Sequence, residues 1–143
     1  MPILDDIGKM LYISSFDDWQ YLVDWYSELT KTKTRSSHEI KEQVAKLFEG
    51  KENLSEEEKI ELIYFFITEN IRYSNIAFRQ SDFIPQKARD VLVTKIGDCK
   101  DLTTLGIAML NEIGIKAYYV RDHKKLTCLL CIHRKHGDKD VQN

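Results

Sequence analysis

The sequence predicts an α+β domain in which helices come first and a small antiparallel sheet follows. Upstream of Gly114, apolar residues recur every three or four positions in several segments, which is the period of an amphipathic helix. Downstream of Gly114, two short apolar runs flank a polar turn, which favours a pair of strands. Helices and strands that are segregated along the chain are typical of α+β folds.

The first helix is expected to begin near Ser15. Serine is a good helix cap, and Asp17 and Asp18 would then lie in the first turn, where acidic side chains are favoured. Its apolar stripe consists of Trp19, Leu22, Val23, Tyr26 and Leu29. A short polar linker, residues 31–35, follows.

Two capping boxes predict the next two helices. Ser36 with Glu39, and Ser55 with Glu58, have the required spacing, and Gly50 is a suitable C-terminal cap for the helix between them. The third helix carries more apolar bulk than one stripe needs, so a central position is expected for it. Its apolar residues are Ile60, Ile63, Tyr64, Ile67 and Ile71.

Residues 71–73 read as an exit into extended chain, residues 75–85 as a loop, and residues 86–93 as a short helix. A turn at Gly97 and Asp98 then precedes a helix that starts at Cys99. The apolar face of this helix comprises Leu102, Gly106, Met109, Leu110 and Ile113.

Cys99 has two interpretations. A thiol in the first turn lies where unpaired N–H groups and the helix dipole favour an anion, so the thiolate fraction rises there. Alternatively, Cys99 is simply the first core residue of an amphipathic helix, since buried free cysteine is common.

Residues 115–120 and 126–134 are expected to form an antiparallel hairpin around the polar turn at 121–125. Two strands alone make a poor sheet. Either residues 72–78 supply a third strand, or the chain stops before its sheet is complete. An unpaired edge on the last strand would invite a homodimer through that edge.

The composition is that of a soluble domain with one core. The 143 residues include 21 basic and 23 acidic side chains, so no broad basic surface for nucleic acid is implied. No apolar run is long enough to span a membrane, and three cysteines cannot all pair with one another.

We expect a single domain over residues 1–143, with 1–14 as an arm or the end of a preceding module and 135–143 as a frayed tail. The N-terminus lacks the features of a signal peptide. The chain as given therefore looks cytoplasmic, or like an excised domain of an exported protein.

Several short motifs are spread from Ser14 to about Val120. They are Ser14-Ser15-Phe16-Asp17-Asp18-Trp19, Trp25-Tyr26, Ile71-Arg72-Tyr73, Pro85 with Ala88, Gly97-Asp98-Cys99-Lys100-Asp101, and Ala108-Met109-Leu110 through Gly114-Ile115-Lys116-Ala117. With these motifs the chain resembles the transglutaminase-like cysteine enzymes, most closely bacterial members whose core follows an N-terminal β-rich domain. The resemblance implies a papain-like fold, a Cys-His-Asp triad and acyl transfer or amide hydrolysis on a protein or peptide, without a cofactor or metal.

The resemblance makes Cys99 the nucleophile and places the triad histidine on a later strand, where His133 falls. His136 is the alternative, on the opposite face if the strand continues. The family's acid belongs to a further strand, and Asp138 and Asp140 are too close to His133 along the chain to reach its ring without a tight hairpin. The sequence thus looks truncated or divergent at its C-terminus, and we expect little or no acyl transfer from this chain alone.

Two other functions compete with this one. Cys128, Cys131, His133 and His136 are a suitable ligand set for zinc, but their spacing alternates them between the faces of a strand. The same fold without a working triad would be a non-catalytic protein- or peptide-binding module, with residues 78–83 as the first contact candidate.

Overall fold

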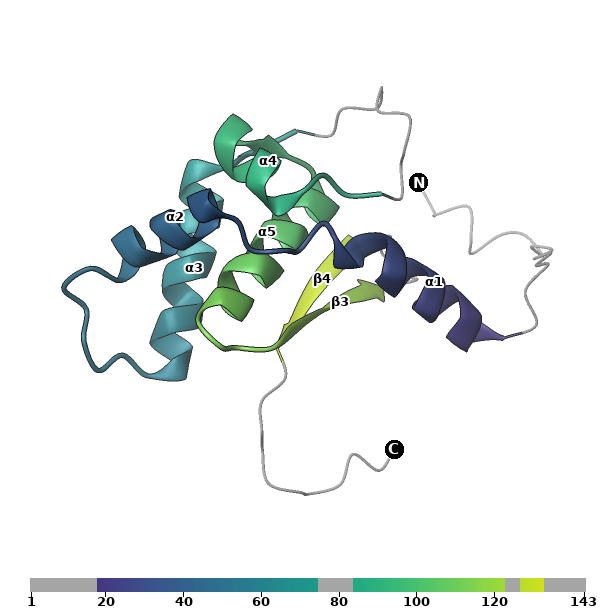
Figure 1. The fold of residues 1–143 in the computed structure, drawn as a ribbon, viewed down its shortest axis with the longest axis horizontal. Coiled ribbons are helices and arrows are strands. Elements are labelled where there is room, and N and C mark those ends of the chain that lie inside the picture. The colour runs from purple at the N-terminus through teal and green to yellow at the C-terminus, as the bar shows by residue number, and fades with distance from the viewer. Residues whose placement is uncertain (1–17, 75–83, 123–126, 133–143) are drawn as a thin grey trace, which may run out of the picture.

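The computed structural model describes residues 18–74, 84–122 and 127–132. In these residues the helices come first and a hairpin of two strands comes last, which confirms the α+β expectation (Figure 1). The elements are α1 (Trp19–Lys31), α2 (His38–Phe48), α3 (Glu56–Asn70), β1 (Arg72–Tyr73), α4 (Ala88–Thr94), β2 (Ile96–Gly97), α5 (Cys99–Glu112), β3 (Ala117–Asp122) and β4 (Thr127–Ile132).

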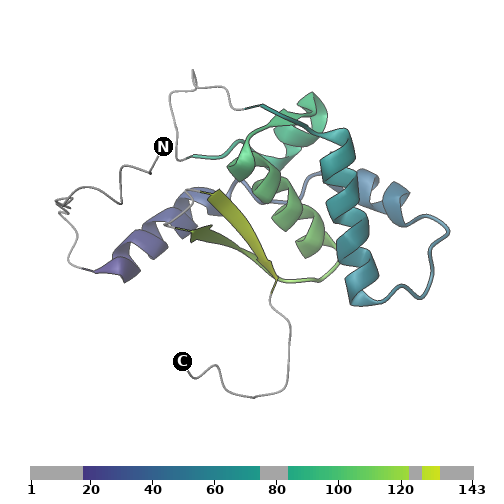
Figure 2. The same cartoon turned by 180° about the vertical axis from the view of Figure 1, so that it is seen from behind.

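The central element is α5. Figures 1 and 2 show α2, α3 and α4 on one side of it and the β3–β4 hairpin on the other. Every α5 residue from Thr103 to Leu110 is buried. The core also takes side chains from the surrounding elements, including Ile40, Val44, Ile63, Ile67, Ile71, Val91, Leu92, Ile115 and Ala117.

The expected central position of α3 is wrong. Ile63 and Ile67 are buried, but Tyr64 and Phe65 are 61% and 52% exposed. Their rings pack edge to face on each other at a centroid distance of 5.7 Å. The additional apolar bulk of α3 is therefore on the surface, and α3 is a flanking helix.

The N-terminal caps differ from expectation in two of three helices. Asp18, expected inside the first turn, is the N-cap of α1 and accepts a hydrogen bond from Gln20 N–H at 2.9 Å; Ser15 lies outside the described residues. At α2 the N-cap is Ser37, because the Ser36 hydroxyl donates to Glu112 of α5 instead. The capping box of Ser55 and Glu58 is confirmed, with bonds of 3.2 and 2.7 Å.

The strands form two separate pairs. β3 and β4 pair antiparallel, with Ala117 opposite Ile132 and Asp122 opposite Thr127, which confirms the hairpin. β3 continues through Arg121 and Asp122, two residues beyond its expected end. β1 is extended as expected, but it pairs in parallel with β2 rather than joining the hairpin. The expected arm 1–14, residues 75–83 of the expected loop 75–85, and the tail 135–143 lie outside the described residues.

An ion pair on the surface joins α2 to α4. The Arg89 Nε is 2.7 Å from Glu39 Oε1. Hydrogen bonding from Arg89 is the largest of the effects that lower the pKa of Glu39 from 4.5 to about 2. Because the pKa is lower in the folded state, this stabilisation is fully present above the unfolded value of 4.5 and is lost as the pH falls towards 2.

We therefore expect Glu39→Gln to make stability less dependent on pH in the acid range. The measurement is the urea midpoint at about pH 6 and about pH 3, since the wild type should lose more stability between them than the variant. Glu61→Gln, at an exposed position of α3, is the matched control. Equal losses in Glu39→Gln and the wild type would contradict the role of this pair.

Candidate active site

The candidate site begins where β2 ends and α5 starts. Asp98 is the N-cap in an extended conformation, and Cys99 is the first helical residue, as expected. The Oδ1 atom of Asp98 accepts hydrogen bonds from Lys100 N–H at 3.0 Å and Asp101 N–H at 3.2 Å. The first turn of α5 is thus fixed directly around the cysteine.

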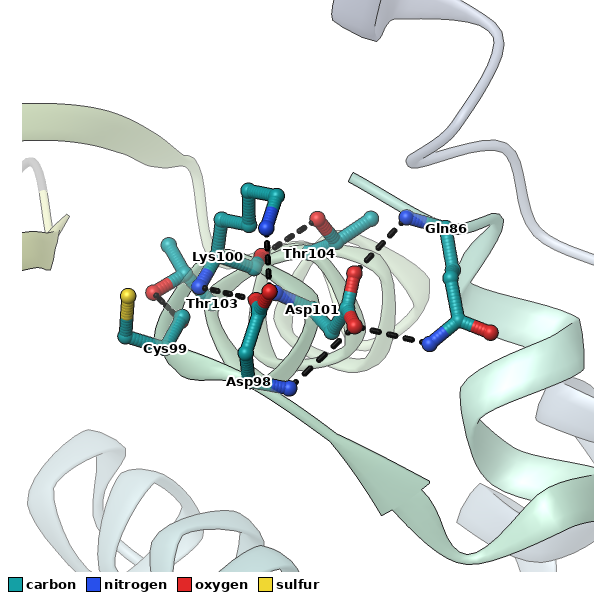
Figure 3. Close-up of polar contacts among 7 residues, drawn as sticks. All are labelled: Gln86, Asp98, Cys99, Lys100, Asp101, Thr103 and Thr104. Atoms are coloured by element: carbon teal, nitrogen blue, oxygen red, sulfur yellow. Dashed lines mark hydrogen bonds and ion pairs between the residues drawn. The ribbon is translucent and has the colours of Figure 1, made fainter. Parts of the chain in front are cut away.

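Cys99 carries a free thiol that is half-buried. In Figure 3, which looks along α5, the sulfur lies on the side of the helix away from Gln86 and Asp101. The Thr103 hydroxyl donates to the Cys99 carbonyl at 2.8 Å, which further fixes the backbone that carries the thiol. A thiol at the start of a helix can act as a nucleophile only if it faces a cleft, and we predict such a cleft in front of the sulfur.

The neighbours of Cys99 in sequence form an ion pair. The Lys100 Nζ contacts Asp98 Oδ2, and the two side chains are only 13% and 16% exposed. Lys100 therefore offsets the negative charge of the capping carboxylate next to the thiol. Since a nearby anion opposes formation of a thiolate, this pairing matters for a nucleophile at position 99.

Asp101 completes the capping box from inside the protein. Its Oδ2 accepts a hydrogen bond from the Asp98 N–H at 3.2 Å, and Asp101 is only 2% exposed. Gln86 donates to both carboxylate oxygens, from its backbone N–H and from Nε2, each at 2.7 Å (Figure 3). Because three N–H groups donate to it, this carboxylate can be buried without losing its hydrogen bonds.

Tyr119 of β3 links the hairpin to α5. The Thr104 hydroxyl donates to the Lys100 carbonyl at 2.7 Å, so its oxygen accepts from the Tyr119 hydroxyl at 2.5 Å. The Tyr119 ring also meets Tyr26 of α1 edge to face, at 5.8 Å between centroids. The strand pair is thereby docked on the same helix that carries Cys99.

The structure does not test the other candidate residues. His133, His136, Asp138, Asp140 and the loop at 78–83 lie outside the described residues. Cys128 and Cys131 belong to β4, where they pair with Arg121 and Tyr118. Among the described residues, no group of three or more His, Cys, Asp or Glu side chains is arranged to hold a metal ion.

A hollow lies at the end of α5 that is opposite Cys99. It is lined by Val44, Ala45, Phe48, Lys51, Asn53, Leu54, Lys59 and Ile113. Because it lies at the opposite helix end, we do not assign it to the cysteine chemistry.

In the part of the chain that the structure describes, no helix is long and apolar enough to cross a membrane.

Comparison with known proteins gives one match. Residues 41–128 match the model of the transglutaminase-like superfamily, a span that runs from α2 into β4 and contains Cys99. No curated protein and no solved structure matches the chain. The matched span covers more than half of the sequence and includes the helix that opens with cysteine, so the chain belongs to the transglutaminase-like superfamily.

Proposed function

We propose that this chain is a cysteine-dependent acyl-transfer or amide-hydrolysis domain that acts on a protein or peptide, with Cys99 as the nucleophile. The observation that carries the proposal is the place of Cys99, a half-buried thiol at the first position of a capped helix. The positive end of the α5 dipole favours a negative sulfur there. Membership of the transglutaminase-like superfamily supports the same chemistry.

The proposed reaction has two steps. The Cys99 thiolate attacks the carbonyl carbon of an amide, the C–N bond breaks, and the amine leaves with a proton from a histidine, so that a thioester remains. Water or a second amine then attacks the thioester, which yields an acid or a new amide and returns the thiol. We propose His133 as the base, with His136 as the alternative, and we assign no triad acid.

The backbone near Cys99 suits an oxyanion. The Cys99 N–H forms no hydrogen bond with the described residues, whereas the next two N–H groups bond the Asp98 side chain. A free N–H next to the nucleophile can donate to the negative oxygen that develops on the attacked carbonyl. This supports acyl chemistry at Cys99 rather than a purely structural thiol.

The test is the rate at which Cys99 reacts with iodoacetamide. In a variant with Cys128→Ser and Cys131→Ser, only Cys99 can be alkylated. We expect it to react at neutral pH roughly tenfold faster in the folded protein than in urea, since unfolding removes the helix terminus. Addition of Cys99→Ala should abolish labelling.

A folded-state rate equal to or below the rate in urea would contradict the proposal. A buried core cysteine is shielded by folding and reacts more slowly than in the unfolded chain. That result would favour the alternative, a protein- or peptide-binding module on the same fold.

A further inference from the structure

Gln86 forms hydrogen bonds to Asp101 with both its backbone and its side chain. The Gln86 N–H donates to Oδ1 and Nε2 donates to Oδ2, each at 2.7 Å. The same Oδ2 accepts the Asp98 N–H at 3.2 Å. Because Asp98 directly precedes Cys99, one carboxylate connects Gln86 to the turn that presents the thiol (Figure 3).

The surrounding chain holds Gln86 in place. Pro85 before it is fully buried, and α4 begins two residues after it. The N–H of Ala88, the first residue of α4, donates to the Lys33 carbonyl in the segment after α1 at 2.9 Å. The orientation of the Asp101 carboxylate is therefore set by a fixed part of the fold.

Gln86 is not placed to touch a substrate at the sulfur. In Figure 3 it lies on the opposite side of α5 from the Cys99 thiol. Its two hydrogen bonds instead disperse the charge of Asp101, which is separated from Cys99 by one residue. A buried carboxylate without such donors would disfavour a second negative charge on the nearby sulfur.

We propose that Gln86 is a positioning residue that acts through Asp101. It holds the first turn of α5, and it offsets negative charge that would oppose a thiolate at Cys99. This inference rests on the proposed function, because it matters for catalysis only if Cys99 is the nucleophile.

The test replaces Gln86 by methionine, which has a similar length, keeps the backbone N–H and lacks the side-chain donor Nε2, in the Cys128→Ser and Cys131→Ser background. Gln43→Met, at a half-buried position of α2, is the matched control. Cys99 is alkylated with neutral iodoacetamide and with anionic iodoacetate. We expect Gln86→Met to slow alkylation roughly three- to tenfold, and to slow iodoacetate more, because the negative charge of Asp101 is compensated less and repels the anionic reagent.

A second variant, Gln86→Glu, places a carboxylate against Asp101 and should reduce the ratio of iodoacetate to iodoacetamide rates further. Rates and ratio equal to those of Gln43→Met would overturn the inference. An equal slowing of both reagents would also overturn it, since a purely structural role does not distinguish them. Failure of the proposed function itself would be seen in a different measurement. In the protein with Gln86 unchanged, Cys99 would then react no faster in the folded state than in urea.

Discussion

Replacement of Asp101 by alanine is expected to lower the free energy of unfolding by about 3 kcal/mol. The carboxylate accepts three hydrogen bonds at 2.7, 2.7 and 3.2 Å, and the residue is 2% exposed. Alanine leaves these donors, two on Gln86 and one on Asp98, without a partner inside the protein. A buried donor that loses its acceptor costs roughly 1–3 kcal/mol, partly recovered if water enters.

Urea unfolding at neutral pH measures this effect. Asp24→Ala, at an exposed position of α1, is the matched control and should change stability by less than about 0.5 kcal/mol. Asp101→Asn keeps the shape of the side chain but turns an amide N–H₂ towards N–H donors. It should therefore lose much of the stability that Asp101→Ala loses. A loss below about 1 kcal/mol for Asp101→Ala would show that the network does not hold the start of α5.

Gly97→Ala should have the second large effect, a loss of about 2–3 kcal/mol. A Cβ at this position would lie 2.7 Å from the Asp101 Cβ, 3.1 Å from Leu102 Cδ1 and 3.3 Å from Val91 Cγ1. Asp101 cannot move aside without loss of its hydrogen bonds to Gln86 and Asp98. The clash therefore displaces the backbone directly before Cys99.

Gly114→Ala separates this steric effect from backbone strain. Gly114 has a φ of +82°, and a Cβ added there would have no neighbour within 4 Å, so alanine should cost about 1 kcal/mol through strain alone. The comparison is made by thermal and urea unfolding of the two variants. A Gly97→Ala protein as stable as the wild type would mean that the turn accepts a Cβ.

The sequence predicts the start of the cysteine helix well because its signals are local. Asp98 is a good N-cap, and the helical period begins at once with Cys99. Gly97, which the sequence places in a turn, is instead the last residue of β2. The Ser55 box is equally local and is confirmed. Ser36 and Ser37 are both suitable caps in a local reading, but Ser37 caps the helix and Ser36 bonds the distant Glu112, a contact that local sequence does not reveal.

The central role of α5 was harder to predict because part of its buried face is polar. Thr103 and Thr104 bond the carbonyls of Cys99 and Lys100, four residues earlier, and can then be buried at little cost. In α3 the opposite occurs, since Tyr64 adds apolar bulk to the pattern and is nevertheless exposed. Hydrophobic periodicity alone therefore predicted the wrong position for α3.

The Gln86–Asp101 contact had no sequence signal. The spacing of Asp98 and Asp101 fits a capping box, but the partner that fixes Asp101 lies 15 residues away in the chain before α4. Such a contact depends on how α4 packs beside α5. It becomes visible only when the tertiary structure is known.

The most direct test of the central claim is acylation of Cys99 by an activated ester. p-Nitrophenyl acetate needs no protonated leaving group, so the thiolate can displace nitrophenolate and form an acetyl thioester without a complete triad. We predict a burst of nitrophenolate and an acetyl group on the Cys99 peptide by mass spectrometry, both lost in Cys99→Ala and retained in Cys128→Ser with Cys131→Ser. A burst that survives Cys99→Ala, or an acetyl group found only elsewhere, would contradict Cys99 as the nucleophile.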